Sequence, residues 1–142
     1  MERGDIAVYE RPERACIFEG LLAVPPHKLK TFFKREEDAE TSLKKWKANE
    51  LPLKSLIDGT NRLGIHTQVV TLLGPDMEEP VYQWLLRKGV SCSVHAYGSL
   101  AEAIEDFKYN RALHTIMVPD QEMAAQIGLR AKVVSPTTTW SN

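Results

Sequence analysis

Short β-type runs alternate with helical patterns from residue 65 onward, and this alternation is the feature that most constrains the fold. The β-type runs are "IHTQVVTLLG", "VSCSVHAY", "ALHTIMVP" and "RAKVVSP"; between them lie "EEPVYQWLLRKG", "SLAEAIEDFKYN" and "DQEMAAQIG". Consecutive parallel strands need a connection of helix length, and each of these helical segments supplies one. The pattern therefore predicts an α/β fold, a Rossmann-like three-layer sandwich with a mostly parallel central sheet.

The first part of the chain adds a central strand and a helical insertion. Residues 15–18, "ACIF", are apolar throughout, which is typical of a strand covered on both faces. We expect them inside the sheet, between strands that contain residues 69–70 and 116–118. Residues 27–62 carry apolar side chains at helical spacing and predict a small helical insertion. We expect residues 135–142 to form a tail and residues 1–142 to form one domain.

Composition indicates a soluble globular protein and gives no sign of a nucleic-acid or membrane partner. The chain has 18 basic and 19 acidic residues, 43% hydrophobic and 26% charged residues. A net charge of −1 creates no overall field that would attract nucleic acid or an anionic membrane. Cys16 and Cys92 lie in apolar or alternating stretches and are expected to be free thiols, which suits the cytoplasm.

Polar residues follow the ends of several expected strands. Ligands of an open parallel sheet bind outside the carboxyl ends of its strands. Glu19 and Gly20 follow the first strand, Thr71 lies near the end of the next, and Pro119 and Asp120 follow the fourth. These positions are the candidate site.

In the order and spacing of these features the chain resembles the haloacid dehalogenase superfamily, above all the small phosphatases and 5'-nucleotidases of phages and bacteria. The resemblance implies a first motif D-x-D-G-T, a later serine or threonine, a lysine, and closing acids that hold magnesium. Here the first motif reads "IFEGL". Ile17 takes the place of the nucleophilic aspartate, Glu19 that of the acid/base aspartate, Gly20 that of the glycine and Leu21 that of the threonine.

The remaining motif positions are only partly kept. Thr71 matches the second motif, Lys108 is the candidate for the lysine, Pro119 replaces one closing acid and Asp120 remains. Isoleucine can neither attack phosphorus nor bind Mg²⁺. The resemblance therefore implies a phosphatase-like fold with a degenerate site, for which we expect no catalytic residue, no bound metal and no cofactor.

Three functions are consistent with this pattern. The first is a non-catalytic, pseudo-phosphatase domain that binds a protein as an accessory, scaffold or regulatory subunit in the cytoplasm of a bacterium or phage-infected cell. The second is a divergent, Mg²⁺-dependent phosphatase or 5'-nucleotidase that acts on a small phosphomonoester. The third is a nucleotide or phosphate sensor that uses the kept positions: Glu19, Gly20, Thr71, Lys108 and Asp120.

Simpler roles and a partner surface complete the predictions. Glu19 can serve as a strand-end acid, Thr71 as a β-former, and Asp120 as a helix N-cap. Segment "HKLKTFFKREEDAETSLKKWK" mixes basic and aromatic residues, but its four acids make nucleic-acid binding an unfavoured interpretation. A protein partner is expected and a homo-oligomer stays open. The expected partner surface comprises Phe32, Phe33, Trp46 and Trp140.

Overall fold

Five parallel strands form the main sheet of the computed structural model, which describes residues 13–24, 43–61 and 66–134. The order across the sheet is β5-β4-β1-β6-β7. The strands are β1 (Glu13–Ile17), β4 (His66–Thr71), β5 (Val94–Ala96), β6 (Leu113–Val118) and β7 (Ala131–Val133). All four strand pairings are parallel. The predicted parallel sheet is confirmed, although β5 is shorter than the run "VSCSVHAY" indicated.

Strand β1 occupies the centre of the sheet, as its apolar sequence predicts. Cys16 lies opposite Val69 of β4 and Met117 of β6, and Ile17 lies opposite Val70. Both Cys16 and Ile17 are completely buried. The strand is covered on both faces, and this requires apolar side chains at successive positions.

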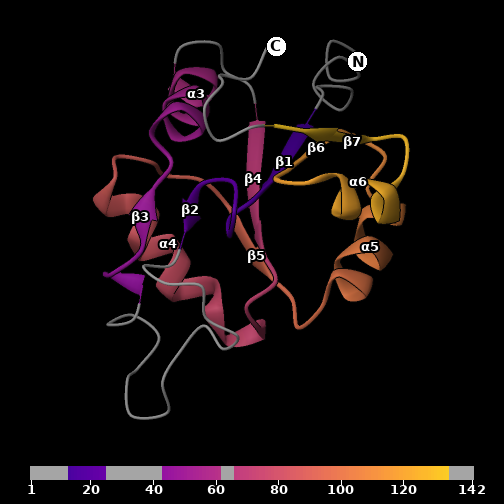
Figure 1. Cartoon of the computed structure of the whole chain (residues 1–142), viewed down its shortest axis with the longest axis horizontal. Coiled ribbons are helices and arrows are strands. Elements are labelled where there is room, and N and C mark those ends of the chain that lie inside the picture. The colour runs from indigo at the N-terminus through magenta and orange to yellow at the C-terminus, as the bar shows by residue number, and fades with distance from the viewer. Residues whose placement is uncertain (1–12, 25–42, 62–65, 135–142) are drawn as a thin grey trace, which may run out of the picture.

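Helices cover both faces of the sheet (Figure 1), which gives the three layers that the sequence predicts. The helical elements are α3 (Glu50–Asn61), the 3-10 helix η1 (Pro75–Met77), α4 (Glu78–Arg87), α5 (Leu100–Tyr109) and α6 (Gln121–Ile127). α3 and α4 pack on the face of Cys16, where Leu56, Trp84 and Val69 share one core cluster. α5 and α6 cover the face of Ile17.

Local signals set the ends of the helices. The Ser99 hydroxyl accepts a hydrogen bond from the Glu102 N–H (3.2 Å) at the start of α5. The Asp120 carboxylate accepts one from the Met123 N–H (2.8 Å) at the start of α6. Each side chain satisfies a backbone donor that the first turn leaves unpaired. The interpretation of Asp120 as an N-cap is therefore confirmed.

Residues 27–62 are only partly helical where they are described: helix α3 matches the expected helical insertion, and residues 47–48 do not. Strand β2 (Ala23–Val24) pairs antiparallel with β3 (Lys47–Ala48), so residues 47–48 are not helical. α3 packs in the helical layer of the core and contacts β4. This part of residues 27–62 therefore belongs to the main body of the fold, because its apolar side chains complete the layer over the sheet.

The expected partner surface is corrected at Trp46. Its side chain is only 3% exposed and stacks on Phe18, with ring centroids 5.8 Å apart. An aromatic side chain buries a large apolar area, and here the core supplies the contact that a partner would have supplied. Trp46 is thus a core residue. Phe32, Phe33 and Trp140 lie outside the described residues.

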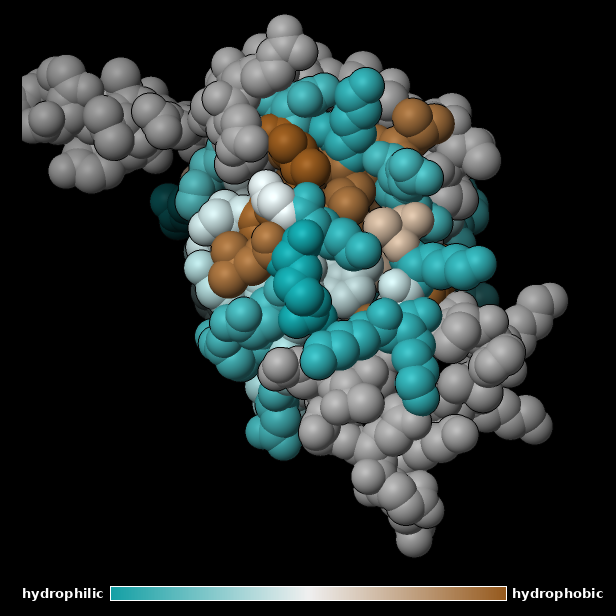
Figure 2. All heavy atoms as spheres, turned by 90° about the vertical axis from the view of Figure 1, so that its left-hand side faces the viewer, coloured by the Kyte–Doolittle hydropathy of each residue, from teal (hydrophilic) through white to brown (hydrophobic). Residues whose placement is uncertain are grey.

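The outer surface on the side of α3 and α4 is mostly hydrophilic in its described part (Figure 2). Hydrophobic atoms lie between the hydrophilic ones in small groups. Leu51 of α3 and Leu86 of α4 are about two-fifths exposed, at 40% and 39%. No helix within the described residues has the length and apolar character needed to cross a membrane.

Candidate functional site

The strand order places a topological switch point between β1 and β6. The chain runs from β1 outward to β4 and β5 on one side, then crosses to β6 and β7 on the other. Sheets of this kind bind ligands in the crevice at the carboxyl ends of the two strands that flank the switch point. Glu19 and Gly20 follow β1 there, and Pro119 and Asp120 follow β6.

Pro119 packs directly against Gly20 across the switch point. A Cβ atom added to Gly20 would lie 3.1 Å from Cγ and 3.2 Å from Cβ of Pro119. Gly20 also has φ of +88°, a backbone conformation that side chains disfavour. The loops after β1 and β6 therefore approach each other closely at the switch point, with the Pro119 ring beside Gly20.

The Glu19 carboxylate binds the end of β4. Its Oε1 accepts a hydrogen bond from the Thr71 hydroxyl (3.0 Å), and its Oε2 accepts one from the Leu72 N–H (2.7 Å). The Thr71 oxygen in turn accepts a weaker hydrogen bond from the Leu73 N–H (3.3 Å). The structure thus brings together Glu19 and Thr71, two positions that the sequence singles out, in a contact that joins the loop after β1 to the end of β4.

Burial dominates the electrostatics of Glu19. Removal from water raises the pKa of its carboxyl group, because the charged form loses hydration. Hydrogen bonds from its own backbone N–H, from Leu72 and from Thr71 oppose this rise by stabilising the charged form. The net direction is upward, so Glu19 holds a proton more readily than an exposed glutamate does.

Asn49 also holds the loop after β1, and the sequence interpretation missed it. Its side-chain amide donates to the carbonyls of Leu21 (2.8 Å) and Gly20 (3.3 Å). Asn49 directly precedes α3, where asparagine is a common helix-start residue. Its position before a helix was the one sequence feature that could have drawn attention to Asn49. Nothing in the sequence indicated that its side chain faces a loop 28 residues away.

The other candidate residues do not join this cluster through any described contact. Lys108 is exposed on α5 and pairs with Glu105 at 2.9 Å. The Asp120 carboxylate caps α6, as described above. Ile17 and Leu21 are completely buried, in different core clusters. Their side chains belong to the packing on opposite faces of the sheet.

The described residues do not fit the magnesium site that the resemblance implies. Mg²⁺ requires near-octahedral oxygen ligands, usually one or two carboxylates with several waters. Here both oxygens of Glu19 accept protein hydrogen bonds, and Asp120 is bound to the start of α6. Among the residues that the structure describes, no three His, Cys, Asp or Glu side chains are grouped so that they could hold a metal ion.

Comparison with known proteins identifies no relative of this chain. No protein-family model, curated protein or solved structure matches this chain. The fold itself defines the class: a small α/β domain with a five-stranded parallel sheet between helical layers.

Proposed function

We propose that this chain is a non-catalytic domain of haloacid dehalogenase-like fold that acts by binding another protein, as an accessory, scaffold or regulatory subunit. One observation carries the proposal. At the switch point, where a sheet of this order would bind a substrate, Pro119 packs on Gly20.

The residues around that contact support the same conclusion. A phosphatase of this layout needs a nucleophile at the end of β1, and position 17 carries a fully buried isoleucine. The remaining carboxylate, on Glu19, links two loops through its contacts with Thr71 and Leu72. Carboxylates in catalysis act on a substrate or with a partner group within hydrogen-bond reach. The partners of Glu19 are structural ones.

Magnesium-dependent release of phosphate tests the proposal. The purified chain is incubated with nucleoside 5'-monophosphates and with an aromatic phosphomonoester, with and without Mg²⁺. We expect no release above background. The Glu19→Ala variant is the matched control, because it removes the only carboxylate that matches the first motif. Release that needs Mg²⁺ and disappears in Glu19→Ala would overturn the proposal and favour a divergent phosphatase.

A phosphate or nucleotide sensor is the second candidate, although the Thr71 hydroxyl is buried and already donates to the Glu19 carboxylate, which repels an anion. In this role the Thr71 hydroxyl and nearby N–H groups would bind phosphate without turnover. A ligand present at 100 times its dissociation constant stabilises a fold by about 2.7 kcal/mol. A rise in melting temperature with phosphate or nucleotides that Thr71→Val abolishes would support the sensor, and no rise is expected from a protein-binding domain.

A further inference from the structure

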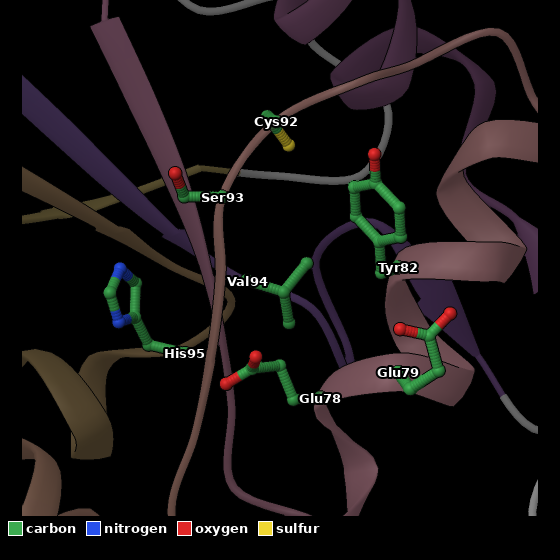
Figure 3. A pocket seen from close by; sticks show the side chains of 7 residues that line it. All are labelled: Glu78, Glu79, Tyr82, Cys92, Ser93, Val94 and His95. Carbon is green, nitrogen blue, oxygen red and sulfur yellow. The ribbon is translucent and has the colours of Figure 1, made fainter.

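A groove runs along the β5 edge of the described sheet, between β5 and the first turns of α4. Its volume is about 410 Å³. Figure 3 shows β5 in front of β4, with Cys92 and Val94 on the side of α4 and with Ser93 and His95 on the opposite side. Seven residues line the groove: Glu78, Glu79, Tyr82, Cys92, Ser93, Val94 and His95.

The backbone of β5 presents hydrogen-bonding groups to this groove. The Ser93 carbonyl accepts from the Val69 N–H (2.8 Å), and the Tyr97 N–H donates to the Thr71 carbonyl (2.9 Å). Residues 93, 95 and 97 therefore direct their backbone groups toward β4. Since these directions alternate along a strand, Val94 and Ala96 direct theirs outward. Within the described part of the chain, β5 has β4 as its only strand neighbour.

The side of the groove formed by α4 combines negative charge with an apolar surface. Glu78 and Glu79 are exposed in the first turn of α4. Neither forms an ion pair with any cation among residues 13–24, 43–61 and 66–134; Glu79 accepts a hydrogen bond from Gln83 (2.6 Å). Beside these carboxylates lies the partly exposed ring of Tyr82, and behind it lies Val94, which is buried with only 7% of its surface exposed.

We propose that this edge binds an extended segment of a partner protein as an added strand, with a lysine or arginine of that segment against Glu78 and Glu79. Strand addition obtains affinity from backbone hydrogen bonds and specificity from alternate side chains. A basic side chain on the α4 side meets the carboxylates, and an apolar one two residues away meets the partly exposed ring of Tyr82. The bound motif is therefore a basic and an apolar residue separated by one position.

Charge complementarity favours a basic partner segment over a second copy of this chain. Antiparallel pairing of two β5 edges would place "SCSVHA" opposite itself, and this stretch contains no lysine or arginine. A second copy paired in that way supplies no permanent cation from its own edge for Glu78 and Glu79. This inference rests on the proposed protein-binding function and assigns it a surface and a partner chemistry.

The test uses fluorescence anisotropy with labelled eight-residue peptides and the full chain. In the first peptide lysine and valine alternate at every second position, with threonine between them (Thr-Lys-Thr-Val-Thr-Lys-Thr-Val), so that both lie on one side of the strand. In the second peptide glutamate replaces every lysine. We expect the lysine peptide to bind at least tenfold more tightly, because charge-assisted hydrogen bonds contribute more than neutral ones. Equal affinity of the two peptides, or no binding of the lysine peptide, would overturn the inference.

Protein variants and backbone methylation locate the contact. Glu78→Gln combined with Glu79→Gln should weaken binding of the lysine peptide about tenfold. Glu122→Gln is the matched control, since Glu122 is also an exposed glutamate in the first turn of a helix, α6, and it should leave the affinity unchanged. N-methylation of one set of alternate peptide residues should abolish binding, and methylation of the other set should preserve it.

The outcomes separate this inference from the proposed function. If the double variant binds like the parent, or if both methylated peptides bind like the unmethylated one, β5 is not the binding edge. This result overturns the inference but leaves the proposed function untouched. Magnesium-dependent phosphatase activity would instead overturn the proposed function, whatever the peptides do.

Discussion

Introducing an aspartate at position 17 tests whether the interior of the sheet can accept the carboxylate that phosphatase chemistry requires. Ile17 has no exposed surface and packs in the cluster that contains Val70, Ile116 and Phe107. Truncating such a residue to alanine costs about 2–5 kcal/mol. An unpaired charge in the same place costs several kcal/mol more, or the carboxyl group stays protonated with a raised pKa.

The cost of the charge is isolated by comparing Ile17→Asp with Ile17→Asn, which has nearly the same shape. The pKa of the aspartate in the folded state should exceed its value in the unfolded chain. Between these two pKa values the folded protein holds more protons than the unfolded chain. The free energy of unfolding therefore falls as pH rises, by about 1.4 kcal/mol per pH unit. Between pH 5 and pH 7 the aspartate variant should lose about 2.7 kcal/mol relative to the asparagine variant.

Denaturant unfolding of both variants at several pH values gives their free energies of unfolding. Ile17→Val is the control for a smaller side chain without a polar group, and it should cost about 0.5–1.5 kcal/mol. If Ile17→Asp is unfolded at pH 7, acidification to pH 5 should refold it. Phosphate release with Mg²⁺ is measured on the same samples, and none is expected. An aspartate variant as stable as Ile17→Asn at every pH would refute the reasoning, as would one that turns over substrate.

Four further predictions concern the residues at the switch point and the effect of Mg²⁺. Glu19→Ala should cost about 1–3 kcal/mol, because the Leu72 N–H loses its acceptor, whereas Glu19→Gln should cost less, since its amide can accept from Leu72 and donate to Thr71. Because burial raises the pKa of Glu19, the parent should lose stability relative to Glu19→Gln as pH rises through that pKa; melting curves across pH measure both effects. Gly20→Ala should cost about 1–3 kcal/mol through its positive φ and the contact with Pro119, and a double-mutant cycle with Pro119→Ala should recover part of that cost. Millimolar Mg²⁺ should leave the melting temperature unchanged; tight binding by calorimetry would contradict this.

Sequence alone determined the elements whose signals are local. The apolar run at residues 15–18 specified a strand covered on both faces, and Ser99 and Asp120 marked the starts of two helices. Alternation of strand and helix after residue 65 specified the parallel sheet, because parallel strands need crossovers of helix length. Each of these signals lies within a few residues of the element that it specifies, so no tertiary contact is needed to interpret it.

Only the tertiary structure decided how distant residues meet. Glu19 binds Thr71 across 52 positions of the chain, and Pro119 fills the space beside Gly20. Trp46 belongs to the partner surface that the sequence predicted, yet its ring packs on Phe18. The two-residue strand at 47–48 is too short to show a period of two. Such contacts depend on the packing of layers against one another, and hydrophobic pattern alone does not specify which side chains face each other across a loop or a sheet edge.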